Sequence, residues 1–168
     1  MQPLTRVSHD HHDVLWQFVN RLNDLADCLN CDCLDTARLE TQLPELREVY
    51  EGLRGSLIPH MDAVEAAVYP TLERILADRD TPVPMAGEHQ EIRRLVAAVG
   101  AFTTDEAAAR ADRASVLAMR RVLLRLYALL KTHLSEEELY IPILEDRLTP
   151  PQEAALARAL DHLATERL

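Results

Sequence analysis

Apolar residues recur along the chain at intervals of three and four, which is the spacing of one face of an α-helix. The first such stretch runs from about Ser8 to about Asn30, with Ser8 as its predicted N-cap. Its predicted inward residues are His11, Val14, Leu15, Phe18, Leu22, Leu25 and Leu29. Residues 28–43 then break the rhythm, which indicates a connection with room for a short helical piece.

The second stretch is predicted to begin near Pro44, because proline suits the first turn of a helix. Its inward residues are Val49, Leu53, Leu57, His60, Val64, Val68, Leu72 and Ile75. Pro59 and Pro70 lie inside it, and each lacks a backbone N–H, so we expect a kink or a local distortion at each. The segment DRDTPVP ends the helix.

The third helix is predicted to begin around residues 85–88 and the fourth to include Pro142 as a late interruption. Their inward residues are His89, Ile92, Val96, Val99 and Phe102, then Met119, Val122, Leu123, Leu126, Leu130, His133, Glu137, Ile141 and Leu144. A fifth, short helix opens with a capping box made by Thr149 and Gln152, and we expect it to pack across one end of the others. The predicted fold class is therefore all-α, an up-down-up-down four-helix bundle with a short fifth C-terminal helix.

A chain of 168 residues suits one domain with a sizeable core. We expect a single domain over residues 1–168, with the bundle at about 8–148 and the C-terminal helix at about 150–166. Acidic residues outnumber Lys and Arg by 28 to 18, for a formal charge of −10. Such a surface repels phosphate backbones and anionic lipid, so we expect no nucleic-acid and no membrane partner.

No apolar run reaches the ~18 residues that span a bilayer, and the first residues lack the layout of a signal peptide. The predicted location is the cytoplasm. The three cysteines, Cys28, Cys31 and Cys33, form an odd-numbered cluster. Incidental thiols are the favoured interpretation, and a soft-metal site or a redox switch is the alternative.

Four histidines fall on the inward faces of four different predicted helices: His11, His60, His89 and His133. Glu137 lies one turn beyond His133 on the same face. A single core histidine is usually only a hydrogen-bonded core residue, but a buried carboxylate is costly unless it is paired or bound to a cation. The set therefore favours a shared metal site inside the bundle. Imidazole and carboxylate without thiolate suit iron, manganese or zinc.

Four stretches occur in order along the chain: DHHDVL, HMDAVEAAVYP, EHQEIRRL and HLSEEELYIP. This order of His, His then Glu, His, and His then Glu resembles the hemerythrin-like (HHE cation-binding) family, over Ser8 to Leu148. The resemblance implies a four-helix bundle with a non-heme di-iron centre that binds or reacts with O2, H2O2 or NO. The alternatives are an iron, oxygen or redox sensor without turnover, and a mononuclear or zinc-occupied site. The implied metal ligands are His11, His60, Glu65, His89, His133 and Glu137.

The second helix departs from this pattern by one residue. The residue four after His60 is Val64, and Glu65 is five after, about 140° away on an ideal helix. Glu65 and Glu137 are nevertheless each five residues before a proline, Pro70 and Pro142. A π-bulge or distortion from a proline would absorb the extra residue and turn Glu65 inward. Otherwise Glu65 is a surface residue and the site has one carboxylate fewer.

Two further positions bear on the site. His11 is preferred to its neighbour His12 because Val14 and Leu15 follow His11 by three and four. Arg93 lies one turn after His89, where oxygen-carrying hemerythrins have a second histidine. That replacement argues against reversible oxygen carriage and favours an oxidant-reactive or sensing site. Glu138 is kept as a reserve ligand.

Overall fold

The computed structural model describes residues 3–29, 36–76 and 83–165, and all the regular structure within these ranges is helical. The elements are α1 (Pro3–Cys28), α2 (Thr36–Gly52), the π-helix η1 (Leu53–Leu57), α3 (Ile58–Ala63), the π-helix η2 (Val64–Val68), α4 (Tyr69–Leu76), α5 (Val83–Ala101), α6 (Asp105–Ala109), α7 (Arg113–Arg147) and α8 (Pro150–Thr165). The elements from α2 to α4 follow one another without a break and form one continuous helical rod.

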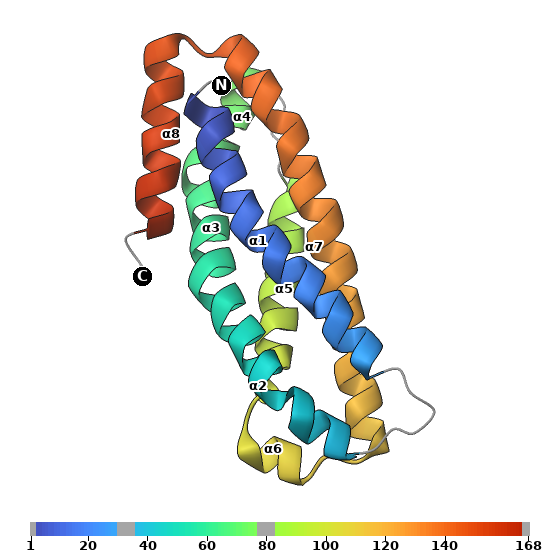
Figure 1. Cartoon of the computed structure of the whole chain (residues 1–168). Coiled ribbons are helices and arrows are strands. Elements are labelled where there is room, and N and C mark those ends of the chain that lie inside the picture. The colour runs from blue at the N-terminus through green and yellow to red at the C-terminus, as the bar shows by residue number, and fades with distance from the viewer. Residues whose placement is uncertain (1–2, 30–35, 77–82, 166–168) are drawn as a thin grey trace.

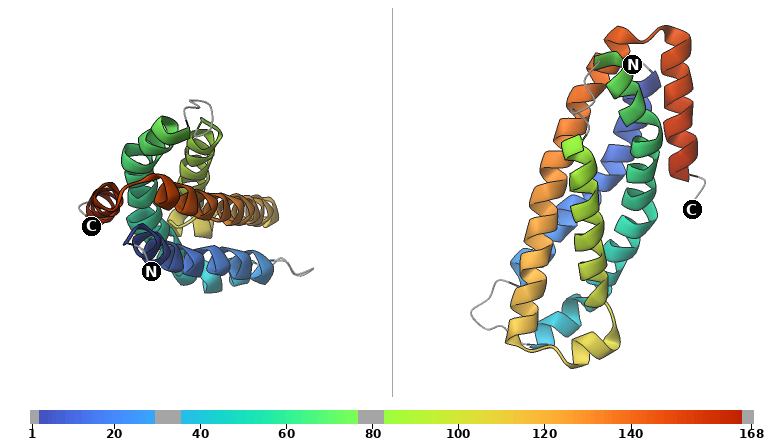
Figure 2. Two further views of the ribbon diagram at one scale, coloured as in Figure 1. Left: turned by 90° about the horizontal axis from the view of Figure 1, so that it is seen from above. Right: turned by 180° about the vertical axis from the view of Figure 1, so that it is seen from behind.

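The long elements lie side by side along the long axis of the molecule (Figures 1 and 2). Helix α7 packs against both α1 and α5, and the rod from α2 to α4 packs against α1 through α2 and η1. Helix α8 folds back after α7 and packs along α1 and α3. The sequence predicted that this last helix would cross one end of the molecule, and that prediction was wrong. Its buried residues Leu156, Ala157 and Leu160 form a stripe that covers the side of α1 and α3 instead.

Both π-helical segments lie just before a proline. Ile58 N–H donates to the carbonyl of Leu53, and Tyr69 N–H to that of Val64, each across five residues. In each case the proline, Pro59 or Pro70, comes two residues after the segment. A proline ring clashes with the carbonyl four residues earlier, and a wider π turn relieves that crowding while taking in one extra residue. The local distortions predicted at these prolines are confirmed.

The other two helix prolines act differently. The second helix begins at Thr36, so Pro44 lies inside α2 and not near its start, and α7 continues through Pro142 to Arg147. Both predictions, a start near Pro44 and an interruption at Pro142, were wrong. Both prolines are exposed, and the residues four positions earlier are exposed as well, so water can bond the carbonyls that each proline leaves without a donor.

The buried apolar residues form two clusters. The large apolar cluster includes Leu15, Leu57, Ile92 and Leu134, and the small apolar cluster, at the end where α7 meets α8, includes Leu4, Val64, Met85 and Ile141. Along α1, α5 and α7 a buried polar residue lies between members of the two: His12, His89 and Glu137. A polar layer therefore separates the two clusters, and this layer is where the candidate site lies.

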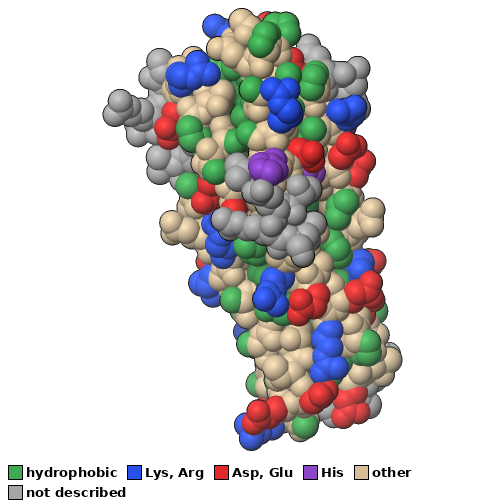
Figure 3. Space-filling view, turned by 90° about the vertical axis from the view of Figure 1, so that its left-hand side faces the viewer, with side chains coloured by type: hydrophobic (Ala, Val, Ile, Leu, Met, Phe, Trp, Pro, Cys, Tyr) green, Lys and Arg blue, Asp and Glu red, His purple; other side chains and the backbone are tan. Residues whose placement is uncertain are grey.

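The surface that carries α8 has acidic and basic side chains interspersed, with hydrophobic side chains scattered among them (Figure 3). In the ranges that the structure describes, no helix is both long enough and apolar enough to cross a membrane.

Candidate metal centre

The register of α1 decides which of the adjacent histidines faces inward. The buried residues of α1 are Leu4, Ser8, His12, Leu15, Val19, Leu22, Leu25 and Ala26. His12 is 2 % exposed, whereas Val14, one of the two residues on which the preference for His11 rested, is 43 % exposed. His11 faces α8, with its Nε2 3.6 Å from Asp161 Oδ1. Steps of three and four back from Leu22 lead to His12 through Val19 and Leu15, but equally to His11 through Phe18 and Leu15, so the spacing alone could not decide between them.

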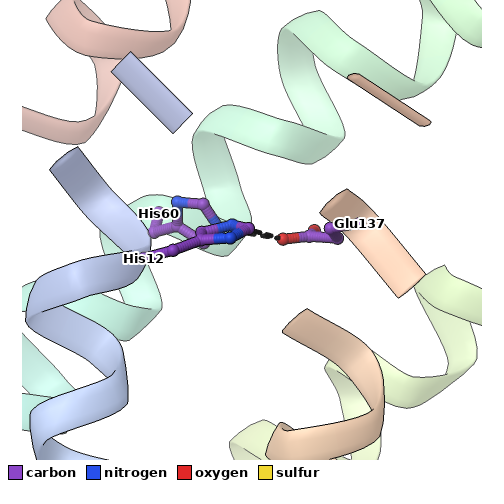
Figure 4. A group of neighbouring side chains, drawn as sticks. All are labelled: His12, His60 and Glu137. Atoms are coloured by element: carbon purple, nitrogen blue, oxygen red, sulfur yellow. Dashed lines mark hydrogen bonds and ion pairs between the residues drawn. The ribbon is translucent and has the colours of Figure 1, made fainter. Parts of the chain in front are cut away.

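Glu137 and two of the histidines form the first group. The Oε2 atom of Glu137 lies 3.3 Å from His12 Nε2 and 3.1 Å from His60 Nε2. All three side chains are buried, and they come from α1, α3 and α7 (Figure 4). Their donor atoms lie within 4.8 Å of one another, which is close enough for a single cation to contact all three.

The other oxygen of Glu137 faces a second pair of histidines. Its Oε1 atom lies 3.4 Å from His133 Nε2 and 3.8 Å from His89 Nε2, and these two nitrogens are 2.8 Å apart. His89, His133 and Glu137 form the second buried group that could hold a metal ion among the described residues. Each oxygen of one carboxylate therefore serves one pair of imidazoles. The hydroxyl of Tyr69 adds an oxygen here, 3.1 Å from His89 Nε2.

The outer nitrogens of three of these histidines contact further carboxylates. The Nδ1 atoms of His12, His89 and His133 lie 3.3, 2.7 and 2.8 Å from Glu138, Glu65 and Glu88, respectively. A carboxylate at Nδ1 keeps the proton on that nitrogen, so the lone pair of Nε2 points at Glu137 and is available to a metal. The Nδ1 atom of His60 is buried and has no hydrogen-bond partner among the described residues.

The protonation of the layer follows from this packing. Burial works to raise the pKa of Glu137, but the nearby imidazoles of His60, His12 and His133 outweigh it and hold that pKa well below its usual range. Burial works to lower the pKa values of His12 and His133, yet their carboxylate partners raise both. Burial dominates at His60 and lowers its pKa. The layer therefore holds an ionised carboxylate among imidazoles.

The structure brings together four of the residues predicted as ligands and leaves two outside. His60, His89, His133 and Glu137 lie in the two groups, and the first helix contributes His12 in place of His11. The reserve residue Glu138 is 42 % exposed and reaches only the outer nitrogen of His12. Glu65 belongs to neither group, and its side chain is 37 % exposed. The π turn η2 does absorb the extra residue, but it leaves Glu65 on the outer side of His89.

The donor set fits a cation of intermediate hardness. Glu137 Oε1 is buried and accepts no hydrogen bond from any described residue, a costly state that a bound cation would relieve. The donors are nitrogen and oxygen without thiolate, which suits iron, manganese or zinc. Cys28 is exposed at the opposite end of α1 from His12, and Cys31 and Cys33 lie outside the described residues.

A small cavity of about 20 Å³ adjoins the layer. Its polar walls include His12, His60, Tyr69 and Glu137. The remaining wall is largely apolar and includes Val64, Val68, Leu72, Met85, Ile141 and Leu160. A space of this size holds about one water molecule, so it admits only a molecule of a few atoms.

Helices that each contribute inward histidines around a shared carboxylate define a class, the all-helical proteins with a metal-binding core. Comparison with known families matches residues 4–144 to the hemerythrin HHE cation binding domain. The match covers more than half of the chain, and this protein therefore belongs to the hemerythrin HHE cation-binding family. Searches among curated proteins and among solved structures find no match.

Proposed function

We propose that this protein holds two metal ions, iron in the favoured case, in a non-heme centre built by His12, His60, His89, His133 and Glu137. The proposal includes an up-down-up-down four-helix bundle formed by α1, the rod from α2 to α4, α5 and α7. The single observation that carries it is the position of Glu137, whose two oxygens each face a different pair of imidazole nitrogens. One carboxylate shared in this way is suited to two cations side by side.

We further propose that the centre binds or reacts with a small oxidant: O2, H2O2 or NO. Iron held there would supply the electrons for such chemistry. The chain contributes a cavity of about 20 Å³, whose largely apolar wall limits water, and the Tyr69 hydroxyl near His89 Nε2 as a hydrogen-bonding group. The acidic partners of His12, His89 and His133 hold protons at the outer nitrogens and keep the inner ones available.

A second candidate is a mononuclear or zinc-occupied site. The observation in its favour is that Glu137 is the one carboxylate in the two groups found among the described residues. One shared carboxylate neutralises the charge of two neighbouring cations less well than two carboxylates would. This candidate predicts one metal ion per chain, in either group.

Metal analysis separates these candidates. The protein is purified anaerobically after iron-replete expression, its metals are counted, and anomalous scattering from a crystal locates and identifies them. Two irons flanking Glu137 with oxo-to-iron absorption after exposure to air support the first proposal, and one metal or zinc supports the second. Metal content well below one ion per chain in the wild type, or unchanged content in Glu137→Gln, would overturn both. Glu136→Gln, beside it on α7 and only half-buried, is the matched control.

A further inference from the structure

Arg93 forms a clamp around Glu65 on the outer side of the candidate centre. It lies one turn after His89 on α5, and its Nη1 donates to Glu65 Oε1 at 2.8 Å. Its Nη2 donates to Asp62 Oδ1, also at 2.8 Å. The same Glu65 oxygen lies 2.7 Å from His89 Nδ1. One carboxylate oxygen therefore serves both a guanidinium and an imidazole.

The two ring nitrogens of His89 point in different directions. Its Nε2 points toward His133 and Glu137, whereas its Nδ1 points to Glu65. Glu65 and Arg93 also line an open surface pocket together with Glu73 and Gln90. The carboxylate of Glu65 therefore lies on the solvent side of the imidazole, and the ring separates it from the space between the Nε2 atoms.

Moving Glu65 inward would break favourable interactions. It would separate two charge-assisted hydrogen bonds, from Arg93 and from His89, which are the stronger kind in proteins. Of its two carboxylate partners among the described residues, half-buried Arg93 would then keep only Asp62.

We infer that Glu65 is a positioning residue for His89, clamped by Arg93, and not a metal ligand of this chain. The inference rests on the proposed metal-binding function and goes beyond it. The carboxylate holds the proton on Nδ1 and fixes the ring, so that the lone pair of Nε2 faces the metal position. The centre then has one shared carboxylate, Glu137, where the family resemblance implied two.

The test uses zinc as a diamagnetic probe in the full chain. Glu65→Gln keeps the shape and an acceptor but removes the charge, and Arg93→Leu removes the clamp. Outer-sphere partners of this kind are worth ~10–100-fold in metal affinity. We expect both variants to bind as many zinc ions as the wild type at saturation, with one subsite weakened ~10-fold or more in chelator competition. The matched controls Glu91→Gln and Arg94→Leu change an exposed ion pair on the same helix and should leave affinity unchanged.

Nuclear magnetic resonance of ¹⁵N-labelled histidine reports the contact itself. We expect the Nδ1–H resonance of His89 to shift in Glu65→Gln, in both the zinc-loaded and the metal-free protein. A Glu65 oxygen at ~2.0–2.2 Å from zinc in a crystal, or fewer zinc ions bound by Glu65→Gln, would show that Glu65 is a ligand and overturn the inference. Unchanged affinity and resonances would overturn it too.

The same data keep the inference apart from the proposed function. A wild-type chain that takes up no metal refutes the metal centre and, with it, any role of Glu65 toward a metal. The metal-free resonances of His89 then still decide whether Glu65 fixes the ring.

Discussion

Glu137 is a buried carboxylate whose charge depends on its neighbours. Three imidazoles, those of His12, His60 and His133, hold its pKa well below the usual value against the effect of burial. A carboxyl group stabilised in its ionised form couples folding to pH, because protonation removes the interactions that burial has made strong. The same charge that would attract a metal therefore also stabilises the metal-free fold.

The sign of this pH dependence can be stated. Because the folded-state pKa of Glu137 is lowered, its contribution is fully present above the unfolded value of 4.5 and is lost as the pH falls through the folded value. We expect the stability advantage of metal-free wild type over Glu137→Gln to shrink as the pH falls below 4.5. It should also shrink as the pH rises above 6.5, where His12 and His133 lose the protons that Glu137 helps them to hold. Urea unfolding of both proteins across the acidic range measures it. A difference that grows as the pH falls below 4.5 would contradict the lowered pKa of Glu137.

The adjacent histidines of α1 give a second test at the residue scale. The rings of His11 and His12 both lie near that of His60, with centroids 5.8 and 5.2 Å away. Of these two histidines, His12 is the one that places a nitrogen next to Glu137. We expect His12→Ala to lose metal from the group of His60, with at least a ~10-fold loss of affinity, and His11→Ala to keep it. Metal counting and chelator competition on the pair decide this, and the reverse outcome would restore His11 as the ligand.

At the scale of elements, the apolar spacing was sufficient to predict the number and order of the long helices, because burial of a stripe is what stabilises them. It failed where the deciding interaction is not local. The choice of His11 rested on Val14 and Leu15, and of these Val14 is exposed. Glu65 was expected to turn inward, but Arg93 on α5 binds it on the outer side of His89. Apolar periodicity identifies the inward face of a helix to within about one residue, but the assignment of metal ligands requires the exact residue.

The π turn η2 contains one residue more than an α-helix needs. Deleting the exposed Ala66 should therefore convert η2 to α-helix and leave Tyr69 and Leu72 buried. Deleting the exposed Ala128 from the middle of α7, which has no π turn, should rotate every later residue by about 100°. We expect a cost below about 2 kcal/mol for the first and above about 4 kcal/mol for the second. Chemical unfolding of the two deletion variants measures both costs, and equal costs would show that η2 is not a removable insertion.

At the scale of the whole molecule, the candidate ligands join parts of the chain that are distant in sequence. They come from α1, α3, α5 and α7, so two cations that share Glu137 would cross-link these four helices at one level. A metal that binds only the folded chain stabilises it by mass action, by about 2.7 kcal/mol at a free concentration one hundred times the dissociation constant. Removal of the metal should therefore lower the free energy of unfolding without unfolding the chain.

That coupling can be followed by hydrogen exchange with and without metal. We expect metal removal to accelerate exchange most in α8, the start of α1 and α4, which pack around the small apolar cluster. The large cluster at the other end has more buried residues and should remain protected. Uniform acceleration along the chain would contradict this, as would none. Mass spectrometry of peptic fragments gives the required resolution.

The polar layer between the two apolar clusters would make the stability of one end of the molecule depend on whether a metal is bound. Hydrophobic contacts make a fold cooperative only where they are continuous, and here the layer of histidines and Glu137 interrupts them. With a cation bound, the two ends would unfold as one unit. Without a cation, the end that carries α8 could unfold locally while the other end stays folded. Metal occupancy of the buried site would then change which surfaces are accessible to proteases and binding partners.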